Sequence, residues 1–586
     1  MFPLLTTIGV FLGALLAAAV STLLMGLVVG YLGQRSRTYF IGGIRNFILI
    51  RDRHLLRLIA FGLTAWLALP VMGLPGGHRF VAHEVLDAFS VVLTILGWSL
   101  AYSRTRRRFV QAVVAFTLTT PSYLAAQAPP PMEIGGIIVS GTVRTRVESW
   151  DWFGDSPDGT YTYPGILARV AVGQTRPARD WQLEFSAPLV FALPDQPFGA
   201  GPAGLGANYF VANGGKTSAA MVFAKQAFVR FKDIGGIKGQ SLTVGRMEFL
   251  DGTEASPTNG TLAALQRDRV SARLIANFGF THVQRSLDGT VYALDRPATN
   301  VTLLAVRPTQ GVFQVDGWGE LNIELAYGAI AHQFGGATDA GQWRLFGAEY
   351  YDGRDGVVKT DSHSIAARQA DHDHVNVATF GGNYLRAIDR GHGTIDVLFW
   401  GAAQIGAWGR LAHRASAFAA EAGWQPKTIL APWIRGGFDY GSGDDDPNDS
   451  SHGTFFQMLP TPRQYARFPF FNLMNNADGF VELMLRPARV LTIRTDVHAL
   501  RLANGNDLWY QGGGAYQPAT FGYVGQPVNG NRRLATLLDA SADVTVTRRV
   551  TVTGYYCYAA GGSASSALYP TSNHAAFGYL ELLVRF

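Results

Sequence analysis

Basic residues recur at alternate positions in several apolar segments of this 586-residue chain. Arg144 and Arg146 are two residues apart, and Arg230 and Lys232 have the same spacing. Residues two apart in an extended strand project to the same side, so each pair presents two positive charges to one surface. Carboxylates give up their water only where fixed positive charge replaces it. The pattern therefore predicts a surface that binds anions.

Other basic residues stand in similar alternating segments, and each has two interpretations. They either line a path for an anion or form structural ion pairs with acids of the same segments, for which Glu148, Glu248, Asp268, Glu482 and Asp496 are candidates. The candidates for the path are Arg144, Arg146, Arg169, Arg230, Lys232, Arg246, Arg269, Arg414, Arg435 and Arg494, and Arg267 and Arg273 have similar surroundings.

Two clusters have the side chains of metal sites. Asp444, Asp445, Asp446 and Asp449, with Asn448, offer oxygen ligands for Ca²⁺, but the late Glu of an EF-hand is missing and a hydrated loop is the simpler interpretation. His363, His372 and His374, with Asp371 and Asp373, are ligand types for a transition metal, yet they also fit an exposed loop. We predict a metal site at neither cluster and no cofactor, because no Gly-rich phosphate loop follows a strand.

Eighteen segments alternate between apolar and polar residues after position 129, with an uncertainty of about two segments. They are separated by turn-rich sequence in which Asp288-Gly289 and Asp352-Gly353 have hairpin chemistry. The segments are Gly135–Glu148, Ile166–Gly173, Trp181–Phe191, Ala220–Lys232, Ser241–Phe249, Val270–Val283, Val301–Val306, Glu320–His332, Trp343–Tyr351, Val375–Ala387, Thr394–Gln404, Leu411–Trp424, Ile429–Tyr440, Gly479–Arg486, Val490–Leu502, Leu534–Val546, Val550–Tyr558 and Ala575–Phe586.

These segments have the length that crosses a bilayer when tilted, so we expect one all-β antiparallel transmembrane barrel over residues 129–586. The 68 Gly and 12% aromatic residues suit such a barrel, with Gly at close strand contacts and aromatics at the membrane interfaces. A barrel of this width encloses an aqueous lumen. A lipid-facing charge at mid-membrane costs about 2–4 kcal/mol, so the candidate basic residues should face inward. A soluble all-β protein is the alternative fold.

The last segment, Ala575–Phe586, places Leu580, Leu582, Val584 and Phe586 on one face, and Tyr579, Glu581 and Arg585 on the other, with Leu583 as the exception. It resembles the closing strand of bacterial outer-membrane barrels, where this strand is also the signal for the assembly machinery. The resemblance implies that the closing strand pairs with Gly135–Glu148 and brings Glu581 and Arg585 close to Arg144 and Arg146.

The first 128 residues differ from the rest. Residues 1–103 contain three apolar stretches (Phe2–Gly33, Leu58–Pro75 and Val85–Tyr102), and residues 104–128 have the three parts of a secretory signal peptide, ending at Ala126-Gln127-Ala128. Residues 1–103 are either an over-extended reading frame, which we prefer, or inner-membrane helices.

The net charge of +6 comes from the first 128 residues, which hold 11 Arg and three acids, whereas the rest has 38 basic and 40 acidic residues. Nucleic-acid binding is therefore not expected. The single cysteine, Cys557, rules out an intramolecular disulfide.

Specific motifs resemble the alginate-export family of outer-membrane proteins. They are Gly141–Trp150, Val244-Gly-Arg-Met-Glu-Phe249 with Arg267-Asp-Arg269, and Phe438–Asp449 followed by Thr454-Phe-Phe and Leu459-Pro-Thr461, with weaker support from Asp507–Gly513. Met247 stands where the family has Gln, and residues 1–128 have no counterpart. The resemblance implies an eighteen-stranded barrel in the outer membrane of a Gram-negative bacterium.

The sequence leaves several functions open. The first is a porin that passes an anionic saccharide, such as an alginate-like polymer or a sugar acid, or another organic acid. The alternatives are a general uptake porin for small solutes, a surface protein that does not conduct, and an outer-membrane hydrolase. For the hydrolase, Arg494, Asp496 and His498 lie on one strand face, but no Ser motif completes a catalytic site.

The signal peptide can be tested on protein purified from outer membranes. We expect amino-terminal sequencing to begin at Pro129, because Ala126-Gln127-Ala128 is the small-residue cleavage site. A different first residue would remove the assignment.

Overall fold

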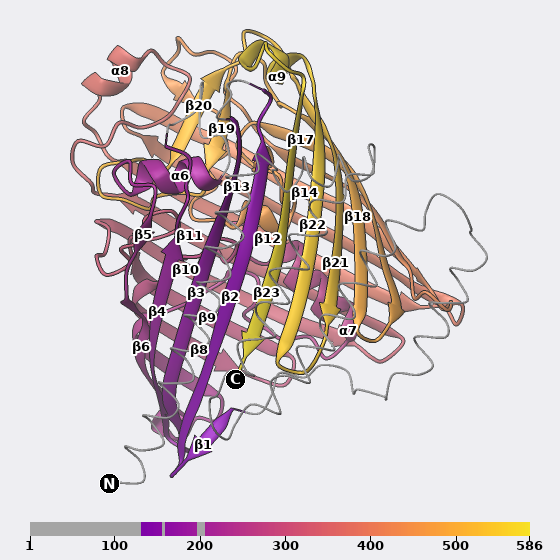
Figure 1. Ribbon diagram of the computed structural model, residues 1–586. Coiled ribbons are helices and arrows are strands. Elements are labelled where there is room, and N and C mark those ends of the chain that lie inside the picture. Colours follow the sequence, from indigo (N-terminus) through magenta and orange to yellow (C-terminus); the bar gives the residue numbers. More distant parts are fainter. Residues whose placement is uncertain (1–130, 155–158, 196–204) are drawn as a thin grey trace, which may run out of the picture.

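The computed structural model describes residues 131–154, 159–195 and 205–586 of the chain. Eighteen strands form one closed, antiparallel barrel, as the sequence predicts (Figure 1). The hydrophobic segment expected at 1–103 and the signal peptide expected at 104–128 lie outside the described residues. Among the residues that are described, no helix is both long and apolar enough to span a bilayer.

Each barrel strand pairs with the next one along the chain. In order, the strands are β2 (Ile137–Asp151), β3 (Thr160–Thr175), β4 (Arg179–Val190), β6 (Phe223–Lys232), β7 (Gln240–Met247), β8 (Leu287–Asp295), β9 (Thr299–Pro308), β10 (Ile323–Gly335), β11 (Asp339–Asp352), β12 (Val375–Asp389), β13 (Gly393–Trp408), β14 (Leu411–Pro426), β15 (Trp433–Gly441), β17 (Asn476–Ala488), β18 (Leu491–Arg501), β21 (Arg533–Thr545), β22 (Val550–Gly561) and β23 (His574–Arg585).

The remaining elements are short and belong to the connections between barrel strands or precede the first of them. They are the strands β1 (Met132–Ile134), β5 (Ala219–Ala220), β16 (Ser451–His452), β19 (Leu508–Gly512) and β20 (Tyr523–Pro527), the helices α6 (Leu205–Ala212), α7 (Gly260–Leu265), α8 (Ile365–Ala370) and α9 (Ser563–Leu568), and the single turns η3 (Ile234–Gly236), η4 (Gln266–Val270) and η5 (Pro462–Gln464). Of these, β19 and β20 form a separate two-stranded sheet.

The barrel closes where β23 pairs with β2, which confirms the expected seam (Figure 1). The register runs from Asp151 opposite Ala576 to Thr142 opposite Arg585. Beyond it, the amide of Gly141 donates to the carbonyl of Phe586 at 2.9 Å, and the amide of Phe586 donates back at 3.0 Å. The backbone hydrogen bonds between the closing strand and β2 therefore continue as far as Phe586.

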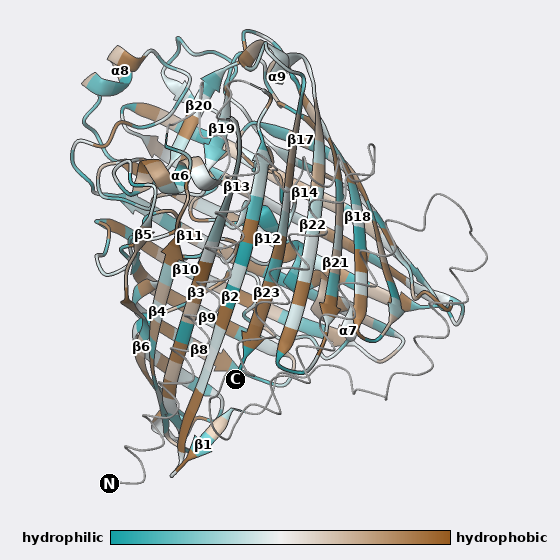
Figure 2. Cartoon of the chain, viewed as in Figure 1, coloured by the Kyte–Doolittle hydropathy of each residue, from teal (hydrophilic) through white to brown (hydrophobic). Residues whose placement is uncertain are grey.

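Hydrophobic and hydrophilic residues alternate along the strands (Figure 2), and large apolar side chains of many strands are exposed on the outer face. On β23, Leu580 and Leu582 are 45% and 39% exposed on the outer face. The inner face carries Glu581, and Leu583 shares that face because it lies directly opposite the inward Arg144. Outward apolar side chains match a hydrocarbon environment, so the pattern is that of a membrane barrel.

The two ends of the barrel differ in the length of their connections. One end has short turns, such as 176–178, 296–298, 336–338 and 390–392, and both β2 and β23 have their free ends there. The other end has long connections, such as 191–222, 248–286, 442–475 and 502–532. In outer-membrane barrels the short turns are periplasmic and the long loops extracellular.

The predicted strand count is right, but one predicted strand is wrong. Val270–Val283 is not a strand of the barrel; it belongs to the long connection between β7 and β8 and lies inside the barrel. β8 is not among the predicted segments, because Asp288-Gly289 has the composition of a hairpin turn. Gly289 instead continues the strand with φ of +152°, a conformation that favours glycine.

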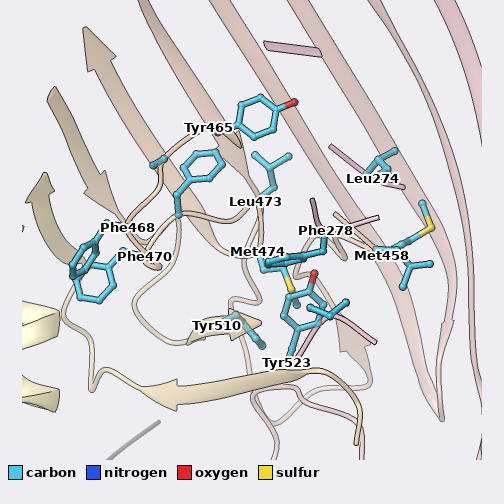
Figure 3. Packing of buried hydrophobic residues seen from close by; sticks show 14 of the residues in the cluster. Leu274, Phe278, Met458, Tyr465, Phe468, Phe470, Leu473, Met474, Tyr510 and Tyr523 are labelled. Carbon is cyan, nitrogen blue, oxygen red and sulfur yellow. The ribbon is translucent and has the colours of Figure 1, made fainter. Parts of the chain in front are cut away.

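Three connections fill the interior. We call them inner segment A (248–286), inner segment B (442–475) and inner segment C (502–532). Their apolar side chains pack together, as Figure 3 shows for Phe278, Leu473 and Tyr523. Segments A and B pair through Ile275 and Leu459. The predicted aqueous lumen is therefore replaced, at this level of the barrel, by packed side chains.

The seam makes a sharp prediction about Gly141. A Cβ atom added there would overlap the ring of Phe586 and the backbone carbonyl of Arg169 on β3, whereas one added at Gly554 of β22 would meet no atom within 4 Å. We expect Gly141→Val to displace the terminal ring, at a cost of about 1–3 kcal/mol for overpacking, and to lower the folded fraction.

The measurement is the heat-modifiable electrophoretic mobility of the refolded barrel. Gly554→Val is the matched control and should fold like the parent protein. Equal folding of the two variants would show that the contact between Gly141 and Phe586 does not govern closure.

Candidate functional site inside the barrel

Inner segment A crosses the interior from one wall to the other. At one side, Arg144 of β2 donates to the carbonyls of Gly279, at 2.9 Å, and of Thr281. At another side, Arg344 of β11 forms an ion pair with Glu254 at 3.1 Å. Strands β2 and β11 are far apart around the barrel, so segment A constricts the interior between them.

Two buried arginines fix the middle of segment A to the wall. Arg273 Nη1 lies 2.7 Å from Asp439 Oδ1 of β15, and Arg269 Nη2 lies 2.9 Å from Glu421 Oε1 of β14. All four side chains are at most 6% exposed. Arg435 of β15 continues the network, because it contacts Glu421 at 3.3 Å. Buried charges are tolerated when they are paired in this way.

A second network lies on the opposite wall, around the seam and β3. Arg146 Nη2 lies 2.7 Å from Glu581 Oε2, across the seam, and its Nη1 lies 3.1 Å from Glu148. Arg169 contacts both Glu184 and Glu248, the latter at 2.7 Å. These ion pairs join strands to one another and to the start of segment A, and so they stiffen the wall.

Eight of the ten candidate basic residues point into the barrel. Arg144, Arg146, Arg169, Arg269 and Arg435 belong to the networks above. Lys232 pairs with Asp180 at 2.8 Å, and Arg230, on the same face, donates to Thr243 Oγ1 at 3.2 Å. Arg494 makes only long contacts, 3.7 Å to Glu482 and 3.9 Å to Asp268.

Arg246 and Arg414 differ from the expectation, because both lie on the outer face. Arg246 is two residues from Val244, which is 42% exposed, and pairs with Asp288 at 2.6 Å. Arg414 is directly opposite Ile405, which is 56% exposed. Both arginines are within a few residues of the loop end of their strands. The cost of an outward charge falls there to about 0–1 kcal/mol, so the energetic argument for an inward position does not apply.

Several interior basic residues are not among the ten candidates from the sequence. Lys225 is fully buried and lies 3.3 Å from Glu248, but a bulge between Glu184 and Phe185 on the partner strand disturbs its alternation. Arg463 and Arg467 belong to inner segment B, which has no strand periodicity. Their one signal in the sequence is their position just after the Leu459-Pro-Thr461 motif.

Arg463 and Arg467 are distinguished from the wall arginines by the lack of a counter-ion. Within the described chain, no carboxylate oxygen lies within 4.0 Å of either guanidinium. Arg467 lies over the ring of Tyr555, 5.1 Å from its centroid, and its Nη1 has no hydrogen-bond partner. These guanidinium groups therefore have unused hydrogen-bonding capacity.

The Asp444–Asp449 loop satisfies its own backbone. Asp446 accepts from the amide of Asn448 at 2.9 Å, and Asp449 accepts from the amide of Ser451 at 2.7 Å. The hydrogen bonds from Ser451 hold the pKa of Asp449 below its usual value, whereas burial raises the pKa of Asp444. Each carboxylate thus stabilises a turn of the loop.

The histidine loop is also held by local contacts. Asp371 lies 3.2 Å from Lys359, and His363 lies 3.4 Å from Asp361. Among the described residues, neither this loop nor Asp444–Asp449 brings three imidazole or carboxylate ligand atoms close enough together for one metal ion.

His498 of β18, the base that a hydrolase would need, has a carboxylate partner. Its Nδ1 lies 2.7 Å from Asp478 Oδ2 of β17, and its ring stacks on Phe480. In the part of the chain that the structure describes, its ring forms no hydrogen bond with a serine or threonine hydroxyl. The arrangement holds the imidazole but supplies it with no nucleophile.

This chain was compared with known proteins. The model of the alginate export family matches residues 208–577. No curated protein matches the chain. Similar solved structures include Pseudomonas aeruginosa OccK9 (OpdG), with 10% identity over 77% of this chain and 98% of that one, and a TM-score of 0.48. Acinetobacter baumannii OccAB2 has 10% identity over 76% and 98%, with a TM-score of 0.49.

The anchoring of inner segment A can be tested by removing its two carboxylates together. In the double variant Glu421→Gln, Asp439→Asn, Arg269 and Arg273 keep their charge without a carboxylate partner. Breaking a buried pair in this way costs about 3–5 kcal/mol. We expect segment A to leave the wall and the single-channel conductance in planar bilayers to rise.

The control is Asp389→Asn, which removes an exposed ion pair with Lys427 at a turn and should leave conductance unchanged. Unchanged conductance in a folded double variant would show that these pairs do not hold the constriction.

Proposed function

We propose, from the premise that this chain belongs to the alginate export family and is an outer-membrane porin, that it passes an anionic saccharide or sugar acid. The finding that carries the proposal is the pair Arg463 and Arg467 in inner segment B. Both lie in the interior, and neither has a carboxylate within 4.0 Å in the described chain. A carboxylate solute would replace its lost water with these guanidinium groups.

Two further arginines add to the positive charge in the same region. Arg267 is 67% exposed and shares Asp268 with Arg494, so that one carboxylate serves two guanidinium groups. Arg467 and Arg494 line one small cavity, which Asp496 and Asp539 also border. By contrast, Arg146, Arg169 and Arg435 of the wall each contact carboxylates. We infer that the wall pairs maintain the shape of the barrel, whereas the incompletely paired arginines contact the solute.

The proposal also includes two partners of the barrel, outer-membrane lipid and the assembly machinery. The outward leucines of β23 contact outer-membrane lipid, and Phe586, at the end of the closing strand, is the residue that the assembly machinery recognises. A solute path lined by arginine needs no cofactor, because electrostatic attraction and hydrogen bonding supply the selectivity.

Ion selectivity tests the proposal directly. In planar bilayers with a KCl gradient, we expect the reversal potential to show a preference for chloride over potassium. In the double variant Arg463→Gln, Arg467→Gln, the permeability ratio should fall by about two- to tenfold, since the focusing positive charge is removed. Uronate oligomers should block the parent channel more strongly than neutral oligomers of equal length.

Arg414→Gln is the matched control, because Arg414 lies on the outer face and should not affect the current. A potassium-selective parent channel would contradict the anionic solute. Equal block by charged and neutral oligomers would instead favour a general porin.

A further inference from the structure

Three acidic side chains, one each on β17, β18 and β21, form a row on the inner wall. Two of them have no basic partner within 4.0 Å in the part of the chain that the structure describes. The register places Asp496 directly opposite Glu482 on one side and Asp539 on the other. Like charges directly opposite destabilise a sheet. Within the described residues, no Arg or Lys nitrogen lies within 4.0 Å of Asp496 or Asp539. This row therefore differs from the rest of the interior, where acids such as Glu421 are paired with arginine.

A buried imidazole completes the group. His498 is two residues from Asp496 on the same face of β18 and is 2% exposed. The ligand atoms of Asp496, His498 and Asp539 all lie within 4.8 Å of one another. Two bonds of about 2.0–2.4 Å to a common ion span such a separation, so a small movement of these side chains suffices to bind it.

Neighbouring groups hold two of these ligands in position. Asp478 Oδ2 lies 2.7 Å from His498 Nδ1, which leaves Nε2 as the ring nitrogen available to an ion. The hydroxyl of Tyr555 donates to Asp539 Oδ1. A carboxylate behind a metal-bound histidine fixes the ring and raises its basicity, as is common in metal sites.

The remaining oxygens have no donors. Asp539 is 4% exposed, and its Oδ2 has no hydrogen-bond partner; the same holds for Asp496 Oδ1. Buried polar atoms normally have a hydrogen-bond partner, so these two oxygens are available to bind a ligand. A small cavity of about 10 Å³ borders Asp496 and Asp539 and is also lined by Arg467, Arg494 and Tyr555. It has room for roughly one water molecule beside the two carboxylates.

We propose that Asp496, His498 and Asp539 bind one divalent transition-metal ion, for which Zn²⁺ is the representative. An imidazole with two carboxylates suits Zn²⁺ and its first-row neighbours, whereas Ca²⁺ and Mg²⁺ prefer oxygen ligands alone. The ion supplies a positive charge in direct contact with Asp496 and Asp539, which Arg467 and Arg494 of the same cavity do not approach within 4.0 Å. Asp478 is a positioning residue, because it acts through His498. The competing arrangement is a protonated His498 that serves as the counter-charge.

The test is zinc titration of the purified, folded full barrel in detergent after treatment with a chelator. Isothermal titration calorimetry with ZnCl₂ should give one site per chain, and Co²⁺ should give the visible absorption of a bound ion. We expect His498→Ala and Asp539→Asn to abolish this site. Asp478→Asn should keep the stoichiometry but weaken binding by about 10–100-fold, the usual effect of losing the residue behind a ligand.

Asp543→Asn is the matched control, since Asp543 lies on the same face of β21 but bonds to Thr553, at 2.6 Å. It should bind zinc like the parent protein. Heat-modifiable mobility establishes that each variant is folded. The proposal is overturned if the folded parent binds no stoichiometric zinc, or if His498→Ala and Asp539→Asn keep the parent affinity; a protonated His498 would then be the counter-charge.

Discussion

Ion pairs between buried side chains fix inner segment A to the barrel wall, and this attachment organises much of the interior. Arg269 and Arg273 bring two guanidinium groups into the barrel on inner segment A, and Glu421 and Asp439 are the carboxylates that accept them. Removing either side of such a network leaves an uncompensated charge in a poorly hydrated environment. The segment is consequently held at one depth and against one pair of strands, β14 and β15, and the packing of segments B and C follows from that position.

The family motifs gain a physical meaning from this arrangement. Glu248 of the Val244–Phe249 motif pairs with Arg169 and Lys225, where segment A leaves the wall. Arg269 and Asp439, from two other motifs, belong to the anchoring network, and Leu459 of the last motif pairs with Ile275. The motifs therefore describe how segments A and B are attached to the wall. They determine the position of the constriction more directly than the identity of the solute.

Charged side chains in the interior have three different roles. Paired arginines hold strands and segment A together and have little capacity left for a solute. Arg463 and Arg467 lack carboxylate partners in the described chain, which is why we place solute contacts there. The row from Glu482 to Asp539 has the opposite imbalance, an excess of acid, which a bound cation would relieve. All three arise on one inner surface because the outer surface faces lipid and excludes charge except near its edges.

The predicted number of strands is right because the false strand Val270–Val283 offsets the unpredicted β8, and the pairing of β23 with β2 was implied by the resemblance to outer-membrane closing strands. The sequence by itself determined the barrel, because a period of two and an outward apolar face are local properties. It also placed most basic candidates on the correct face by the same alternation. Only the tertiary structure decided that Val270–Val283 is an inner segment and not a strand, since a segment buried among other loops has the same apolar pattern as a buried strand. It alone decided which arginines have carboxylate partners, that Arg246 and Arg414 face outward near the strand ends, and that His498 lies between acids from two neighbouring strands. Those facts depend on contacts between residues far apart in the chain, which alternation within one strand does not encode.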